Sequence, residues 1–183
     1  AKYPSDEEIL SVGVRGIYIG NFFKWEGKKN AEQMMKEYDW RPSKKPFERT
    51  YRNFSNLDNR YSNGVSDLLK FVKFGYGRCT DHASKDIRNK HFNRDKGIEL
   101  VKKYDHVVSG DLQHWLEYVN MSKQSFWETA DKFRDPRVWT IKNRQWYKGD
   151  IWGGESAYGD VYLNDEKINE FNEKKKKLHN RKI

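Results

Sequence analysis

The chain has 183 residues, which suits one domain with a buried core or one large part of a longer protein. Its hydrophobic content of 36% is low, but 15% of the residues are aromatic, and this aromatic content argues against an intrinsically disordered chain. The net charge of +9 allows an acidic partner such as nucleic acid, whereas the single cysteine, Cys79, excludes an internal disulfide and a cysteine-cluster zinc site.

The first third of the chain predicts two helices, a strand and a long loop. Residues 5–8 form a capping-box pattern that starts a short helix, and residues 16–20 are typical of a short buried strand or extended segment bounded by glycines. Residues 30–40 carry a helical stripe that we expect in the core, formed by Ala31, Met34, Met35 and Tyr38. Residues 47–63 predict a long, ordered loop.

The middle of the chain predicts packed helices with short connections. Apolar residues recur at helical spacing in residues 65–74, 94–104, 111–120 and 123–133. Asn93 and Ser122 are placed to cap two of these helices. We expect one shared core, formed by Ile98, Leu112, Trp115, Leu116, Phe126 and Trp127.

The last part of the chain predicts a small hairpin in residues 138–147, an unassigned loop in residues 149–159 and a terminal helix in residues 165–179. The fold class is therefore mainly α and bundle-like, with minor β structure in the strand at 16–20 and in the hairpin. Much of the excess positive charge lies in the terminal helix, which we interpret as a solvated helix end rather than a phosphate-binding tail. Because no signal-peptide pattern and no apolar run of membrane length is visible, we expect a cytoplasmic location without a membrane partner.

The stretch KFGYGRCTDHASKDIR, residues 73–88, places two close glycines before a helix start. Thr80 or Asp81 is expected to cap the helix, whose N-terminus would attract an anion, and Asp81, Lys85 and Arg88 would share one face. The alternative is an ordinary connection with a solvated surface pair, and spacing alone favours it because short glycine motifs are unspecific. His82 has no partner at metal spacing, so a structural role is expected and no metal site is predicted.

Three pieces of the sequence resemble a known family: GNFFKWEGKKN (residues 20–30), KFGYGRCTDHASKDIR (residues 73–88) and NRDKGIELVKKYDH (residues 93–106). In their residues, order and spacing they resemble the C-terminal half of the N-acetyl sugar amidotransferases of lipopolysaccharide and flagellar-glycan biosynthesis. These enzymes are PP-loop ATP pyrophosphatases, of the group that adds the acetamidino group to pseudaminic-type sugars.

The resemblance implies a reaction, partners and site residues. ATP, with Mg²⁺, would activate an N-acetyl amide oxygen on a nucleotide-linked amino sugar, and ammonia from a glutaminase subunit would then displace AMP. The resemblance implies catalytic roles for Arg78, Lys85 and Arg88. It implies substrate-binding roles for Lys24, Trp25, Lys28, Lys73, Gly75, Gly77, Thr80 and Asp81.

The sequence departs from that family in one respect. The Ser-Gly-Gly-x-Asp-Ser loop of the family and the strand–helix alternation around it are absent. We therefore expect residues 1–164 to be the helical substrate-side region and residues 165–183 a basic C-terminal helix or tail. An N-terminal PP-loop half, in the same or a separate chain, would be needed for activity, so this chain alone should bind no ATP. The alternatives are a basic helical module that binds nucleic acid, for which no recognition motif is found, and an interaction module without catalysis.

Overall fold

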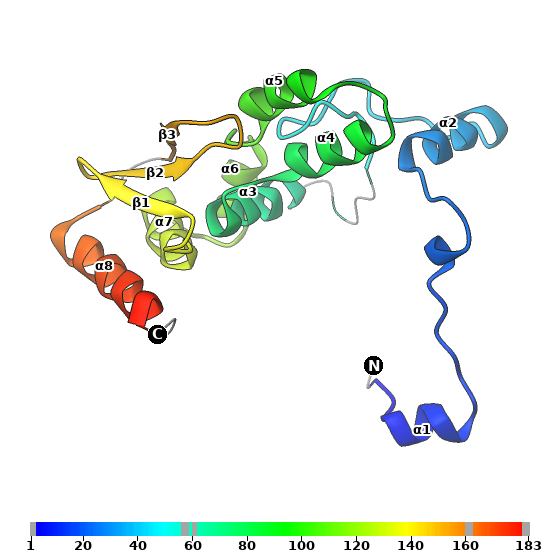
Figure 1. Ribbon diagram of the computed structural model, residues 1–183, viewed down its shortest axis with the longest axis horizontal. Helices are drawn as coiled ribbons and strands as arrows, with labels where there is room; N and C mark the ends of the chain where they lie inside the picture. The colour runs from blue at the N-terminus through cyan, green and yellow to red at the C-terminus, as the bar shows by residue number, and fades with distance from the viewer. Residues whose placement is uncertain (1–2, 56–58, 60–61, 160–162, 181–183) are drawn as a thin grey trace. The chain divides into compact units, whose positions relative to one another are not determined.

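The structure, a computed structural model, describes residues 3–55, 59, 62–159 and 163–180. Within these residues the chain is mainly helical with one small antiparallel sheet, which confirms the predicted fold class (Figure 1). The α-helices are α1 (Asp6–Ser11), α2 (Gly27–Glu37), α3 (Asn63–Phe74), α4 (Arg78–Arg88), α5 (Arg94–Tyr104), α6 (Asp111–Tyr118), α7 (Lys123–Ala130) and α8 (Asp165–Asn180). The other elements are the 3-10 helices η1 (Ile19–Asn21) and η2 (Asp131–Phe133) and the strands β1 (Trp139–Lys142), β2 (Gln145–Gly149) and β3 (Glu155–Ala157).

The chain divides into two compact units, Ala1–Arg41 and Pro42–Ile183. In the first unit, the predicted capping box is present at Ser5, and it starts α1. The predicted strand at residues 16–20 is wrong, because η1 begins at Ile19 and the preceding residues have no regular structure. A strand needs a neighbour for its backbone hydrogen bonds, and the sheet of the described residues contains only β1, β2 and β3.

The stripe of α2 is mostly exposed, contrary to the prediction that it lies in a core. Ala31 is buried, but 43% of Met34 and 68% of Tyr38 are exposed. Helical spacing indicates that residues share a face, but it does not show what covers that face.

The first core of the second unit lies where α3 packs against α6 and α7. Helical spacing places one face of α3 inward, and it meets the apolar faces of the two later helices. The buried members are Val65, Leu68, Val72, Leu112, Leu116, Phe126, Trp127 and Ala130, with Trp115 packed at the edge. Most of the predicted core is thus confirmed. Ile98 is the exception, since it is half-buried on α5 and is not a member of this cluster.

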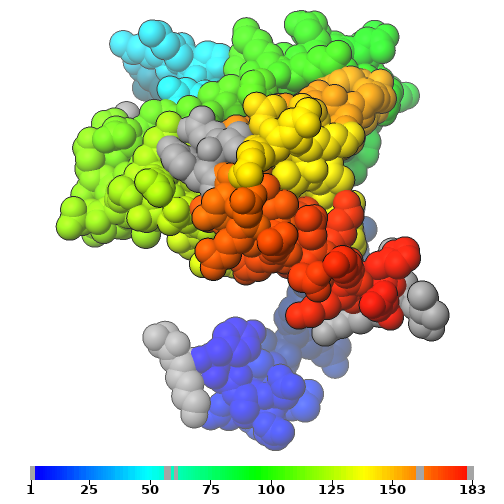
Figure 2. All heavy atoms as spheres, turned by 90° about the vertical axis from the view of Figure 1, so that its left-hand side faces the viewer, coloured from blue at the N-terminus to red at the C-terminus, as the bar shows by residue number. Residues whose placement is uncertain are grey.

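The second core lies between the predicted hairpin and α8. Asn143 and Arg144, both with positive φ, join β1 to β2, as expected for a tight two-residue turn. Trp146 of β2 packs edge-on against Phe171 of α8, with ring centroids 4.9 Å apart. Figure 2 shows α8 lying against the hairpin. The terminal helix is confirmed, and its apolar stripe helps to cover the sheet.

A third, smaller core joins α4 to α5. Cys79, Ala83 and Val101 are its buried members. Helix α5 has the predicted bounds, and the Asn93 side chain caps it by accepting a hydrogen bond from the Lys96 N–H. Among the helices of the described residues, none combines the length and apolarity that a membrane crossing requires.

Candidate functional site

The predicted glycine turn joins α3 to α4, and its two glycines have separate structural roles. Gly75 ends α3 with φ of +74°, and a Cβ at this position would lie 2.5 Å from Val138 Cγ1. Gly77 is the N-cap of α4, and a Cβ there would lie 2.8 Å from Asp105 Oδ1. Both glycines therefore allow a close approach of other parts of the protein. Their substrate-binding roles stay predictions.

The positive end of α4 is occupied by a carboxylate of the protein itself. Asp105, directly after α5, accepts hydrogen bonds from the Gly77 N–H at 2.8 Å, the Thr80 N–H at 3.1 Å and the Thr80 hydroxyl at 2.6 Å. The prediction that Thr80 or Asp81 caps this helix is wrong, because α4 begins at Arg78 and both residues lie in its first turn. The free N–H groups at a helix start favour a bound anion, and α4 follows this rule. The anion, however, is the carboxylate of Asp105 and not an external ligand.

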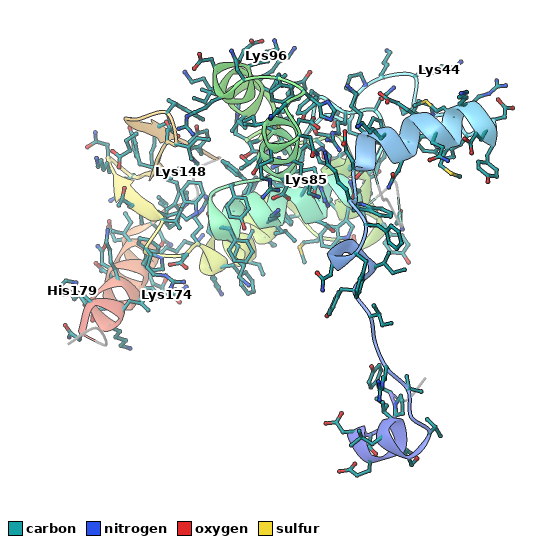
Figure 3. The ribbon with its side chains drawn as sticks, turned by 45° about the vertical axis from the view of Figure 1, so that its right-hand side comes forward. Lys44, Lys85, Lys96, Lys148, Lys174 and His179 are labelled. Carbon is teal, nitrogen blue, oxygen red and sulfur yellow. The ribbon has the colours of Figure 1, made fainter. Side chains whose placement is uncertain are left out.

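The three predicted catalytic cations share one face of α4. Arg78, Lys85 and Arg88 are spaced by seven and three residues, so they fall within one side of the helix. Arg78 forms a 3.0 Å ion pair with Asp67 of α3, whose side chain is only 5% exposed. Lys85 (Figure 3) lies on α4 and is exposed. Arg88 is exposed as well, and neither side chain forms an ion pair with any described residue. These two side chains are available to an anionic ligand.

The remaining predicted substrate residues lie in different settings. Asp81 forms an ion pair with Lys70 of α3 rather than with Lys85, which lies one turn further along α4. Lys73 is exposed near the end of α3, with its Nζ 5.0 Å from the ring centre of Phe74. Three further residues belong to the N-terminal unit, and their binding roles stay predictions: Lys24, Trp25 and Lys28.

Arg49 organises the polar network that joins α3 and α4, although no sequence pattern predicts this role. It is 2% exposed, and its guanidinium donates to the backbone carbonyls of Asp67 at 3.3 Å, Asp105 at 2.5 Å and Val107. Burial lowers the pKa of Arg49 to about 10, so the side chain stays charged at neutral pH. The residue thereby ties the loop before α3 to both aspartates that organise α4.

His82 of α4 is a buried, neutral imidazole. Its Nδ1 lies 2.7 Å from the Thr50 hydroxyl, and it is 4% exposed. Burial, followed by the charges of Arg52 and Arg78, lowers the pKa of His82 to about 3. A histidine that takes up no proton near neutral pH is unsuited to general base catalysis, which supports the structural role inferred from the sequence.

A cavity of about 610 Å³ opens beside this network. The loop before α3, the start of α3 and the start of α6 form its walls, and the volume is in the range of small-molecule sites. Two of the lining side chains are more than nine-tenths buried and carry a polar atom without a hydrogen-bond partner: Arg49 Nε and Ser109 Oγ. Buried polar atoms are normally paired, so these two are exceptions; both are enclosed by protein and present almost no surface to the cavity.

The helix starts at this cavity are also capped by carboxylates. The Gly64 N–H of α3 donates to Asp111 Oδ2 at 3.0 Å, and the Gly110 N–H at the start of α6 donates to Glu48 Oε2 at 2.6 Å. Asp67 also lines the cavity, and burial raises its pKa although Arg78 acts in the opposite direction. The ion pair between Asp67 and Arg78 therefore connects the cavity wall to the cationic face of α4.

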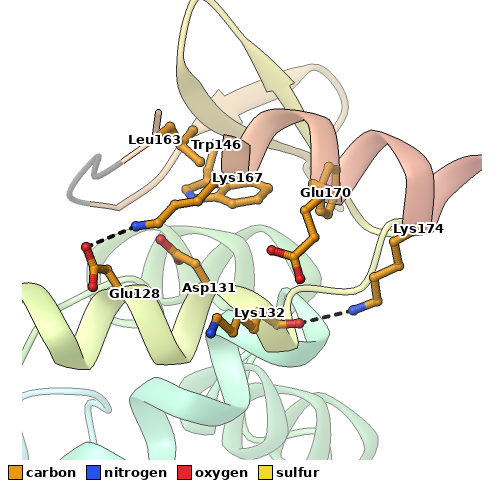
Figure 4. A pocket seen from close by; sticks show the side chains of 9 residues that line it. Glu128, Asp131, Lys132, Trp146, Leu163, Lys167, Glu170 and Lys174 are labelled. Carbon is orange, nitrogen blue, oxygen red and sulfur yellow. Dashed lines mark hydrogen bonds and ion pairs between the residues drawn. The ribbon is translucent and has the colours of Figure 1, made fainter. Parts of the chain in front are cut away.

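A second, much smaller cavity of about 40 Å³ lies between α7, η2 and α8 (Figure 4). Lys167 of α8 pairs with Glu128 of α7 at 3.4 Å, and Lys174 donates to the Lys132 carbonyl at 3.1 Å. These contacts hold α8 against α7 and η2. The volume has room for water but not for a sugar, so we do not assign a substrate to it.

Arg49, Ser109 and Gly110 were not predicted as site residues, and only the last two carry a local sequence signal. Ser109 and Gly110 stand directly before a predicted helix, where small residues commonly accompany caps and close contacts. Arg49 lies in a polar loop, and its carbonyl partner at Val107 is 58 residues away, so no local pattern identifies it.

Comparison with protein families identifies the region that contains these features. A family model described as "LPS biosynthesis protein WbpG-like, C-terminal domain" matches residues 48–151. No match was found among curated proteins. The matched range holds the three α4 cations, Asp105 and most residues of the larger cavity. Because the match covers more than half of the 183 residues, this chain belongs to the WbpG-like C-terminal domain family of LPS biosynthesis proteins.

Proposed function

We propose that this chain is the substrate-side part of an ATP-dependent amidotransferase that converts a sugar N-acetyl group into an acetamidino group. Family membership supports a role in LPS biosynthesis. The resemblance of residues 20–30, 73–88 and 93–106 supports the amidotransferase chemistry. The observation that carries the proposal is the ligand-sized polar cavity, which the Asp67–Arg78 ion pair joins to an exposed cationic helix face.

In the proposed reaction, the amide oxygen of the acetamido group attacks the α-phosphorus of ATP and releases pyrophosphate. Ammonia then adds to the activated carbon and AMP leaves, so the C–O bond is replaced by a C–N bond and an amidine remains. Negative charge accumulates on the phosphate groups in the first step. Lys85 and Arg88 would supply positive charge there, and fixed positive charge is most effective where water is excluded.

The residues of this chain do not fit a complete Mg²⁺–ATP site. The helix start that could cradle a phosphate already binds Asp105, and no group of three metal-ligating side chains occurs among the residues that the structure describes. We therefore propose that ATP and Mg²⁺ bind an N-terminal PP-loop half in the same or a separate chain. A glutaminase subunit would supply ammonia.

The test is amidine formation by this chain combined with a PP-loop half, compared with the chain alone. We expect ATP-dependent product only from the combination. Lys85→Ala and Arg88→Ala should each lower turnover roughly a hundredfold or more, as the loss of one charged transition-state contact does elsewhere. Lys177→Ala, in the exposed lysine run of α8, is the matched control and should leave turnover unchanged. ATP-to-AMP turnover by the chain alone would contradict the proposal.

A further inference from the structure

We infer that residues 14–18 add as a strand to the sheet of a partner domain, and that the partner is an α/β domain whose sheet is covered on both faces. In this chain alone the segment is not a strand, and Figure 1 shows it as an extended trace between α1 and η1. The identity of the partner, the N-terminal PP-loop half, rests on the proposed function. The physical basis is the exposure, the backbone and the residue pattern of the segment itself.

The chain around this segment is apolar and exposed. Between residues 9 and 25 the only charged side chains are Arg15 and Lys24, whereas 34% of the whole chain is charged. The large apolar side chains of this stretch are 60% to 83% exposed: Leu10, Val12, Val14, Ile17, Tyr18, Ile19, Phe22, Phe23 and Trp25.

The exposed apolar area is large enough for a stable interface. A buried aromatic side chain removes roughly 150–250 Å² from water, so the four aromatic residues of the stretch, about three-quarters exposed, present roughly 450–750 Å². The five aliphatic side chains add to this area. An interface of standard size buries about 800 Å² on each partner, so this stretch supplies one side of such an interface by itself.

The backbone of residues 14–18 is available for pairing. These residues have no regular structure and none of them has positive φ, while Tyr18 has the extended angles φ −80° and ψ 99°. The N–H groups of residues 15–18 have no hydrogen-bond acceptor among the residues that the structure describes. An extended stretch with unpaired N–H groups can add to the edge of a sheet through main-chain hydrogen bonds.

The side chains indicate the kind of sheet. Alternate residues of a strand point to opposite faces, so Val14 and Tyr18 would lie on one face and Ile17 on the other, with Arg15 at the entry of the strand. Both faces are therefore apolar. Strands that are apolar on both faces are typical of parallel sheets with helices on each side, whereas a sheet with one face in water needs alternating apolar and polar residues. The partner is therefore an α/β domain.

A second copy of this chain offers no such sheet among its described residues. The sheet is antiparallel, and β2 alternates between buried and less buried residues, so one face of the sheet is open. A strand added there would leave one of its apolar faces in water. Two copies of residues 14–18 paired with each other would form only a two-stranded ribbon, which is marginally stable. A lipid bilayer is disfavoured as well, because unpaired N–H groups are costly in hydrocarbon.

The experiment measures amide hydrogen exchange of residues 15–18 in the 183-residue chain, alone and with the PP-loop half. The half is either joined in one polypeptide or added as a separate chain. In the chain alone these amides should exchange like those of an unstructured peptide, because they have no acceptor. With the PP-loop half they should become protected roughly 100-fold or more, as amides of a buried strand do.

Two variants test the two faces of the strand. Ile17→Asp places a charge on a buried face, and Tyr18→Ala removes a buried aromatic ring, so each should raise the Kd for a separate PP-loop half roughly 10- to 100-fold. In a joined polypeptide each should reduce the protection of residues 15–18. Neither should change the melting temperature of the chain alone, where both side chains are exposed. Tyr118→Ala is the matched control, since this tyrosine of α6 is 89% exposed, and it should associate like the native chain.

Three results would overturn the inference. The first is residues 15–18 that stay unprotected while the PP-loop half is bound. The second is a dimer of the native chain in sedimentation that Ile17→Asp dissociates, and the third is binding of the native chain, but not of Ile17→Asp, to vesicles of phosphatidylethanolamine and phosphatidylglycerol. Amidine formation with unprotected residues 15–18 would remove the strand and leave the proposed reaction standing. Protection without amidine formation would support the strand and remove the reaction.

Discussion

Replacing Asp105 by alanine should destabilise the fold at the point where α4 begins. The carboxylate is 4% exposed and accepts three hydrogen bonds, from Gly77 and twice from Thr80. Loss of an N-cap alone costs about 0.5–2 kcal/mol, and a hydrogen bond to a charged group contributes about 1.5–3 kcal/mol. Because the three bonds share one acceptor they are not additive, and we expect Asp105→Ala to lower the free energy of unfolding by about 3–4 kcal/mol.

Urea denaturation measures this loss, and hydrogen exchange locates it. In the native protein the Gly77 and Thr80 amides should be protected, and in Asp105→Ala both should exchange rapidly. Asp95→Ala is the control, because that aspartate is exposed in the first turn of α5 and should contribute less than about 1 kcal/mol. A loss below about 1 kcal/mol in Asp105→Ala, with protection retained, would refute the view that this carboxylate is the anion of α4.

Two further predictions follow from single residues. The pKa of His82 is about 3 in the fold, below its ordinary value of 6.5. The stability that this buried neutral imidazole contributes is therefore complete above pH 6.5 and is lost as the pH falls toward 3. Between pH 7 and pH 5 the free energy of unfolding should fall about 2 kcal/mol more in the native chain than in His82→Gln, and equal slopes in urea titrations would disprove this. Gly75→Ala should lower stability by about 2–3 kcal/mol, since it combines left-handed backbone with a clash against Val138. Gly149→Ala is the control, because the added Cβ would lie more than 4 Å from any neighbouring atom, and this variant should melt like the native chain. Similar melting temperatures of the two variants would count against a special role for Gly75.

The helices that the sequence predicts well are those whose signals are local. Helix α5 has the predicted bounds because its cap, Asn93, lies directly before it, and its stripe repeats within three turns. The hairpin was also predictable, since its turn residues lie between two short apolar runs. Strand β3 was missed because it has only three residues and pairs through the backbone of β2.

The site could be predicted only in part, because its contacts join distant segments. The sequence identifies the cations of α4, whose spacing is local, but not the Asp105 cap, which is 25 residues from Thr80 and 28 from Gly77. The larger cavity was invisible for the same reason, since three separate segments form its walls. Burial of Arg49 runs against the usual exposure of arginine, so no pattern of residue types predicts it.

The position of Asp105 changes what the glycine turn means for function. A helix start behind two glycines is often a phosphate site, but here the N–H groups of Gly77 and Thr80 are already used by the protein. Any anion that meets α4 must therefore contact its side chains, and of the three predicted cations only Lys85 and Arg88 are exposed without an ion pair among the described residues. Arg78 instead pairs with Asp67 at the cavity wall, so its charge is already used within the protein.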